Sequence, residues 1–140
     1  MMKILILNGP NLNLQGRRDV DVYGSKSFEE LLETLRAEFN RVEIEFFQSN
    51  IEGELIDKLH SADGKFDGVI FNAGGYTHTS VALRDAVSAI SIPVVEVHIS
   101  NIASREEFRH TSLLTPVCRG AILGFGLEGY RLALISLVGA

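Results

Sequence analysis

The chain of 140 residues has one cysteine, three prolines and no tryptophan. The single cysteine, Cys118, cannot form a disulfide within the chain, and no histidine or aspartate is arranged near it in sequence to activate it, so we interpret it as structural. The sequence also lacks the charged and apolar regions of a secretory signal peptide at its start. Together these features predict a cytoplasmic protein.

Basic residues and long apolar runs are scarce as well. The 13 lysines and arginines are outnumbered by 18 acidic residues, and the net charge of -5 argues against a nucleic acid as the main partner. No apolar run approaches the roughly 20 residues of a membrane span, so we expect no membrane partner. The hydrophobic share of 46% is ordinary for a globular protein, and the length predicts a single domain over residues 1–140.

The hydrophobic residues that are present predict short strands alternating with helices. The expected strands are Lys3–Leu7, Val42–Phe47, Gly68–Phe71, Pro93–Ile99 and Gly120–Gly124. The expected helices run from Ser27 to about Asn40, from Ser49 through Leu59, from Ser80 to Ala89 and from Leu127 to Val138, with a short helical turn over Ser104–His110. Ser27 and Ser49 each precede a glutamate by three residues, which is the pattern of a capping box.

This alternation predicts an α/β protein with a three-layer, flavodoxin-like fold and a five-stranded parallel sheet. In such sheets a ligand binds beyond the carboxyl ends of the strands. Asn8, Asn72 and His98 all lie at or near the end of an expected strand. We therefore expect the functional site at that edge of the sheet.

The loop after the first strand, from Asn8 to Tyr23, is unusually long and rich in amides. It carries the adjacent arginines Arg17 and Arg18 a few residues before the tyrosine. A cation beside a phenol favours its ionised form, which would suit a base. Taken alone, the same segment also fits a solvated surface loop.

The sequence Glu96-Val97-His98 places a carboxylate and an imidazole two residues apart on one strand, so both side chains point to the same face. A carboxylate beside an imidazole stabilises the imidazolium, as a general acid requires. A charged pair in an apolar strand also costs desolvation, which favours function over a structural role.

Three further groups have two readings each. The glycines of the segment from Asn72 to Ser80 could cradle an anion before a helix, or form a flexible turn. His78 and Asp85 lie seven residues apart and share a face of a continuous helix, where they could bind hydroxyls or form a solvated edge. Arg105 and Arg109 could clamp a carboxylate, or pair with nearby acids such as Glu106, Glu107 and Asp85.

Taken together, these blocks resemble the type II 3-dehydroquinate dehydratases, or type II dehydroquinases, over nearly the whole chain. The resemblance rests on Asn8–Leu14, Arg18 with Tyr23-Gly24, Gln48–Asn50 with Glu52–Glu54, Tyr76–Ser80, Glu96–Ile102, Arg105–His110, and Gly124–Leu127 with Gly129-Tyr130. It implies that residues 1–140 form a single catalytic domain that dehydrates 3-dehydroquinate to 3-dehydroshikimate through an enolate, in the shikimate pathway to chorismate and aromatic amino acids. It also implies a reaction without a metal or organic cofactor.

The resemblance assigns catalytic roles residue by residue. Tyr23 matches the base, and Arg18 matches the arginine that lowers the pKa of that phenol. Asn11 matches a residue that helps to hold a water near the enolate oxygen. His98 matches the acid that protonates the departing hydroxyl, with Glu96 orienting it.

The remaining matches concern the substrate and the assembly. The substrate-binding positions are Asn72, His78, Asp85, Ile99, Ser100 and Arg109. Asp85 is supplied by a neighbouring subunit in this family, and Arg105 could assist closure of the tyrosine loop. The family forms homododecamers, built as tetramers of trimers, and the resemblance implies the same here.

Two other classes share the expected fold. A flavodoxin-like protein that binds FMN or a phosphorylated ligand would need a first loop rich in serine, threonine and glycine that feeds a helix directly. A receiver-like signalling domain would need acidic residues at the strand ends for Mg²⁺, whereas the first strand here ends in Asn8. A catalytically inactive relative of the dehydroquinases is the third alternative.

Overall fold

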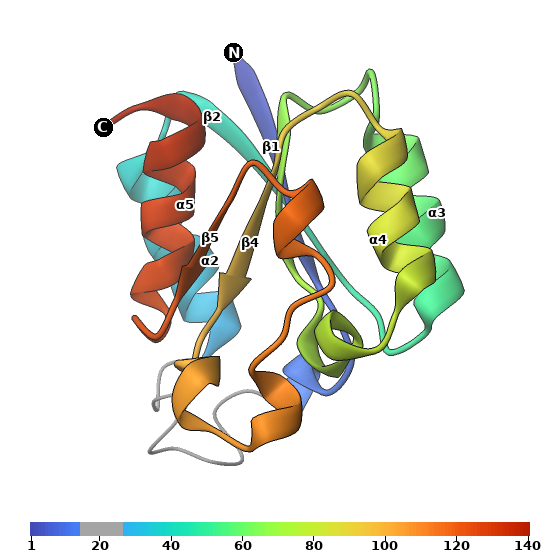
Figure 1. The fold of residues 1–140 in the computed structure, drawn as a ribbon. Helices are drawn as coiled ribbons and strands as arrows, with labels where there is room; N and C mark the ends of the chain where they lie inside the picture. The colour runs from blue at the N-terminus through green and yellow to red at the C-terminus, as the bar shows by residue number, and fades with distance from the viewer. Residues whose placement is uncertain (15–26) are drawn as a thin grey trace.

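The computed structural model of the protein describes residues 1–14 and 27–140, and it contains a five-stranded, all-parallel sheet (Figure 1). The strands are β1 (Met2–Asn8), β2 (Val42–Gln48), β3 (Gly68–Asn72), β4 (Val94–His98) and β5 (Gly120–Leu123). Their order across the sheet is β2-β1-β3-β4-β5, which is the flavodoxin-like order. The predicted fold class is therefore confirmed.

Four α-helices of the described chain cover the two faces of this sheet. They are α2 (Phe28–Glu38), α3 (Glu52–Ala62), α4 (Val81–Ala89) and α5 (Glu128–Val138). Short 3-10 turns are η1 (Leu12–Leu14), η2 (Gly74–His78), η3 (Ile102–Ser104), η4 (Glu107–Arg109) and η5 (Thr115–Val117). None of the helices within residues 1–14 and 27–140 has the length and apolar character needed to cross a bilayer.

Alternation along β1 divides the core into two layers. Ile4 and Ile6 pack with α2 and α5 on one face of the sheet, whereas Leu5 and Leu7 pack with α3 and α4 on the other. Figure 1 shows the same arrangement, with α2 and α5 on one side of the sheet and α3 and α4 on the other. All four of these β1 side chains are fully buried, as expected for a parallel strand covered on both faces.

Only one of the two predicted capping boxes is present. The Ser27 hydroxyl accepts a hydrogen bond from the Glu30 backbone N–H at 3.2 Å and caps α2. The second prediction is wrong, because α3 starts at Glu52 with Ile51 as a cap that makes no side-chain bond. The Ser49 hydroxyl instead accepts from the Ile51 backbone N–H at 3.0 Å and donates to the Glu54 carboxylate at 2.5 Å, so it bonds the turn before the helix and not the Glu52 N–H.

Two other local predictions also fail. His78 and Asp85 do not share one helix face, because His78 ends η2 and Ser80 caps the separate helix α4. The single turn predicted over residues 104–110 is two 3-10 turns, with Arg105 in an extended conformation between them.

The first loop and the turn after β3 make a close backbone contact at the carboxyl edge of the sheet. Gly9 donates its N–H to the Asn72 carbonyl at 2.7 Å. A Cβ on Gly9 would lie 2.5 Å from the Ala73 carbonyl oxygen, and one on Gly74 would lie 3.0 Å from the Pro10 carbonyl oxygen. Gly74 also has a φ of +59°, a conformation that favours glycine. This contact requires glycine on both sides.

We expect Gly9→Ala to destabilise the fold by about 1–3 kcal/mol, because the added methyl meets backbone atoms that cannot move aside. Chemical denaturation followed by circular dichroism measures the free energy of unfolding. Gly75→Ala is the matched control in the same turn, because a Cβ there meets nothing within 4 Å. The control should stay within about 0.5 kcal/mol of the wild type. Equal stabilities for the two variants would show that the Gly9 contact imposes no constraint.

Candidate active site

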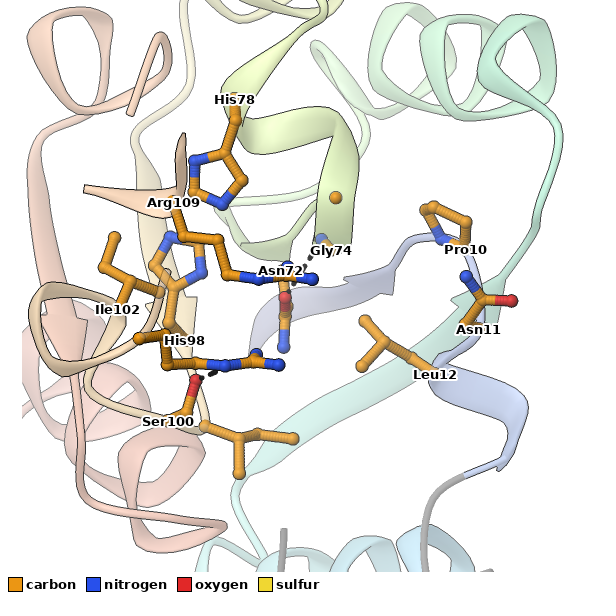
Figure 2. A pocket seen from close by; sticks show the side chains of 13 residues that line it. Pro10, Asn11, Leu12, Asn72, Gly74, His78, His98, Ser100, Ile102 and Arg109 are labelled. Atoms are coloured by element: carbon orange, nitrogen blue, oxygen red, sulfur yellow. Dashed lines mark hydrogen bonds between the residues drawn. The ribbon is translucent and has the colours of Figure 1, made fainter. Parts of the chain in front are cut away.

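A pocket opens at the carboxyl edge of the sheet, where the strand-end loops meet (Figure 2). Its described lining comprises Pro10, Asn11, Leu12, Asn72, Gly74, Gly75, His78, His98, Ile99, Ser100, Ile102, Arg105 and Arg109. This set contains two guanidinium groups and two imidazoles, and no carboxylate. Such a lining suits an anionic ligand with several polar oxygens, and it lacks the acidic residues that a receiver-like Mg²⁺ site needs.

Behind one wall of the pocket lies a buried carboxylate with three side-chain donors. Glu96 is fully buried on β4 and accepts a hydrogen bond from His98 Nε2 at 2.5 Å. Ser112 donates to the same carboxylate at 2.7 Å, and Thr115 donates to its second oxygen at 2.5 Å. Ser112 lies between η4 and η5 and Thr115 starts η5, so this part of the chain closes over the strand end.

This environment keeps Glu96 ionised. Burial raises the pKa of its carboxyl, but the hydrogen bonds from His98, Ser112 and Thr115 outweigh burial and hold the pKa below its ordinary value. An ionised carboxylate only accepts, so His98 Nε2 carries a hydrogen and Nδ1 is the ring nitrogen left for a ligand. A proton delivered from Nδ1 requires the imidazolium, in which both ring nitrogens carry a hydrogen.

His78 faces His98 across the pocket wall. The two rings are stacked, with centroids 6.5 Å apart and planes at 21°. His78 Nδ1 lies 2.8 Å from the Thr111 carbonyl oxygen, which can only accept. Nδ1 therefore carries the hydrogen, and Nε2 is the atom that can bind a hydroxyl of a ligand.

The two arginines of the pocket lining both pair with an acidic side chain. Arg109 Nε donates to the Glu106 carboxylate at 3.0 Å, and Arg105 Nε lies 3.8 Å from the same oxygen. Arg105 also donates to the Ser100 hydroxyl at 3.4 Å. The predicted ion-pair interpretation therefore applies, with Glu106 as the acid that both guanidinium groups share, and the binding interpretation stays a prediction.

Asn11 is held at the mouth of the pocket by the segment after β2. Its φ of +68° is one that asparagine tolerates better than most residues. The Asn11 backbone N–H donates to Asn50 Oδ1 at 2.9 Å, and Gln48 Nε2 donates both to Asn50 Oδ1 and to the Gly9 carbonyl at 3.1 Å. These bonds hold residues 9–11, the start of the first loop, at the sheet edge.

Asn72 ends β3 and is almost completely buried. Its Oδ1 accepts from the Gly74 backbone N–H at 3.1 Å, which Figure 2 marks with a dashed line, and its Nδ2 donates to the Tyr130 hydroxyl at 3.0 Å. Tyr130 belongs to α5, which packs on one face of the sheet. The asparagine is thus held from two sides.

Seven of the residues predicted for the site share the pocket, with Glu96 directly behind His98. The seven are Asn11, Asn72, His78, His98, Ile99, Ser100 and Arg109, and Arg105, predicted to assist the tyrosine loop, also lies in the lining. Asp85 is exposed on α4 and is absent from the lining of this chain. Arg18 and Tyr23, the predicted arginine and base, lie outside the described residues.

Sequence reasoning missed several residues that build the site. Ser112 and Thr115 hold Glu96 from 16 and 19 residues away, and no local pattern links them to the strand. Tyr130 reaches Asn72 across 58 residues. The signal for Tyr130 was a phenol within a largely apolar helix, since a buried tyrosine hydroxyl needs a partner.

We expect Thr115→Val to reduce the free energy of unfolding by about 1.5–3 kcal/mol near neutral pH, because a buried carboxylate loses one donor. The pKa of Glu96 is lowered in the folded protein, so its contribution is present above the unfolded pKa of ~4.3 and is lost as the pH falls through the folded value. The variant should therefore differ less from the wild type in strong acid. Denaturant titrations at both pH values measure the difference.

Thr79→Val is the matched control for this substitution. Thr79 is exposed, and none of the described residues bonds its hydroxyl. The control should keep wild-type stability at either pH. A stability loss in Thr115→Val that is equal at neutral and acid pH would show that the hydroxyl does not act on the carboxylate.

Comparison with known proteins identifies the family of this chain. Residues 2–138 match the family Dehydroquinase class II. A 3-dehydroquinate dehydratase of Bacillus pumilus is 57% identical over 140 residues, covering 99% of this chain and 95% of its own. One from Campylobacter jejuni subsp. jejuni is 54% identical over 139 residues, covering 98% and 87%.

A solved structure gives the same result. The type II dehydroquinase of Butyrivibrio crossotus superposes with a TM-score of 0.93 at 47% identity, over 97% of each chain. The resemblance drawn from the sequence motifs is confirmed by both comparisons. The chain belongs to the class II dehydroquinase family.

Proposed function

We propose that this protein dehydrates 3-dehydroquinate to 3-dehydroshikimate, as a type II 3-dehydroquinate dehydratase of the shikimate pathway. Family membership and the activity for which its relatives are named support the proposal. The structural observation that carries it is the buried Glu96–His98 pair in the wall of a pocket with two arginines and no carboxylate in its described lining. That wall offers an acid for a leaving hydroxyl beside groups that bind an anion.

The proposed mechanism has two proton transfers. The Tyr23 phenolate, with its pKa lowered by Arg18, removes a proton from the carbon beside the ketone and leaves an enolate. Asn11 at the pocket mouth helps to hold a water against the enolate oxygen. The enolate then collapses, the carbon–oxygen bond breaks, and His98 gives its proton to the departing hydroxyl, which leaves as water. No metal or organic cofactor takes part.

The remaining pocket residues bind the substrate. Arg109 pairs with the carboxylate of the substrate. The other oxygens of the substrate bind to His78 Nε2, Asn72 and the Ile99-Ser100 segment. Arg105 assists closure of the tyrosine loop. Each of these groups lines the same pocket, which supports the assignment.

An imine mechanism through a lysine has less support. Lys3 lies in β1 near its amino end and pairs with Glu43 and Glu45. Lys58 lies on α3 over the Phe47 ring, and Lys65 precedes β3. None of these three lines the pocket, and Lys26 lies outside the described residues. The described chain thus offers no amine at the strand ends for a Schiff base.

The proposal extends to the assembly and its compartment. We propose a single catalytic domain over residues 1–140, a cytoplasmic location and a homododecamer built as a tetramer of trimers. Asp85 supports a shared site, because it is exposed on α4 and does not reach the pocket of its own chain. In the assembly it would complete the substrate site of a neighbouring subunit.

We expect the purified protein to produce an ultraviolet absorbance from the conjugated enone when 3-dehydroquinate is added, and Tyr23→Phe to abolish turnover. The phenylalanine keeps the ring but removes the oxygen that takes the proton, so substrate affinity should stay within several-fold. Steady-state kinetics and calorimetric titration measure the two quantities.

Tyr76→Phe is the control for loss of a phenol oxygen, because Tyr76 donates to the Asn50 carbonyl outside the proposed chemistry. It should keep activity within several-fold of the wild type. A wild-type protein without any absorbance change would refute the proposed function. A Tyr23→Phe variant with most of its kcat would assign the proton transfer to another group.

We expect Asp85→Ala chains and Tyr23→Phe chains, each inactive alone, to recover activity when they exchange subunits. A working site then takes Tyr23 from one chain and Asp85 from its neighbour, and random mixing makes about a quarter of the sites complete. Turnover before and after exchange measures the gain. Mixing Tyr23→Phe with His98→Ala chains is the control, because both residues belong to one chain's site. No gain in the first mixture, despite proven exchange, would count against shared sites.

A further inference from the structure

A chain of buried hydrogen bonds runs through the carboxyl edge of the sheet and ends at the pocket. The Gly74 N–H donates to Asn72 Oδ1 at 3.1 Å, and Asn72 Nδ2 donates to the Tyr130 oxygen at 3.0 Å. The Tyr130 hydroxyl in turn donates to Asn8 Oδ1 at 2.9 Å. The chain links β1, β3 and α5, and only Asn72 of its three side chains lines the pocket.

The direction of every bond in this chain follows from its first donor. A backbone N–H can only donate, so the Asn72 atom that faces Gly74 is the oxygen. The other end of the amide is therefore the NH₂ group, and the Tyr130 oxygen must accept from it. The single phenol proton is then directed at Asn8, whose facing atom must be an oxygen. Flipping the Asn72 amide breaks the contact with Gly74, and flipping Asn8 leaves the buried phenol proton without an acceptor.

The surroundings of Tyr130 hold its hydroxyl as an acceptor from Asn72 and a donor to Asn8. The side chain is fully buried, and its ring meets the Phe28 ring edge to face, with centroids 5.0 Å apart. Burial raises the pKa of the phenol far above its ordinary value, despite the bonds from Asn72 and to Asn8. Tyr130 therefore stays protonated and acts through hydrogen bonds rather than as a base, in contrast to the role proposed for Tyr23.

Each N–H of the Asn72 amide then has a defined use. One N–H is donated to Tyr130, and none of the other described residues accepts the second. We propose that Tyr130 is a positioning residue, which locks the Asn72 amide so that its second N–H is offered to an oxygen of the ligand in the pocket. This inference rests on the proposed function, since the ligand oxygen is one that 3-dehydroquinate would supply.

This hydrogen-bond chain lowers the stability of the fold in a way that apolar packing at Asn8 would avoid. Asn8 Nδ2 is buried without a hydrogen-bond partner among the described residues. A buried unpaired donor destabilises a fold, so an apolar side chain at this position would be the better solution for stability. The same asparagine keeps the phenol proton turned away from Asn72, which preserves the donor that faces the pocket. The cost is thus consistent with a positioning role.

A double-mutant cycle separates this role from a merely structural one. Tyr130→Phe removes the acceptor and leaves the ring in place, and we expect it to lower kcat/KM about tenfold, with the same division between kcat and KM as Asn72→Ala. In the Asn72→Ala background the same substitution should change kcat/KM less than about twofold, because Tyr130 acts through the missing amide.

Phe28→Leu is the matched control, because it disturbs the ring packing of Tyr130 without removing a hydrogen bond. It should lower the melting temperature and change kcat/KM by the same small factor in both backgrounds. An equal loss from Tyr130→Phe with and without Asn72, or no loss at all, would overturn the proposal.

Asn8→Leu is the second variant if Tyr130→Phe does not fold. It frees the phenol proton to turn toward Asn72, so kcat/KM should fall in the wild-type background and stay unchanged beside Asn72→Ala. Additive losses would overturn the proposal here too. Wild-type turnover is measured first, because its absence would refute the proposed function itself, and the positioning role would fall with it.

Discussion

The parallel register of the sheet is the constraint on which the site depends. Asn8 at the end of β1 pairs with Asn72 at the end of β3, and Phe71 pairs with Glu96 on β4. Because the strands are parallel and in this register, residues 64 positions apart end side by side. A shift by one residue would exchange the faces of every side chain and move Glu96 out of reach of its donors.

Burial at this edge then demands that each polar side chain be paired. Glu96 and Tyr130 are both inaccessible to solvent, and each has its own donors and acceptors from other elements. A buried carboxylate without partners would protonate or destabilise the fold, whereas a fully bonded one remains charged. The segment from Ser112 to Thr115 and helix α5 therefore support the site, although none of their residues is in the described lining of the pocket.

Prediction from sequence succeeded where the signal is local or periodic. The buried run of β1 and the cap at Ser27 follow from side-chain period and short-range bonding, and both are present. The cap predicted at Ser49 is wrong because the Ser49 hydroxyl accepts from the Ile51 N–H, two residues along the chain, in place of the Glu52 N–H. Motif resemblance identified the family, and seven of the residues that it named for the site line the pocket.

What sequence could not supply are the partners from distant elements. Tyr130 bonds Asn8 across 122 residues, and Thr115 bonds Glu96 across 19 with a turn between. No period or spacing encodes such a pair, since each depends on how the sheet and helices pack. These partners from distant elements determine which atoms of Asn72 and His98 face the pocket. The structure therefore shows which atom of each residue faces the pocket, whereas the sequence motifs pointed to the residues themselves.

The local charge of the pocket differs in sign from the charge of the chain. The sequence carries a net charge of -5, which would repel an anionic substrate at long range. Charges more than roughly 8 Å away are largely screened at physiological salt, whereas Arg105 and Arg109 lie in the pocket lining itself. Glu106 pairs with both arginines from an exposed position and neutralises only part of their charge. Two cationic side chains thus line a pocket of an acidic chain, so net charge alone is a poor guide to what this pocket can bind.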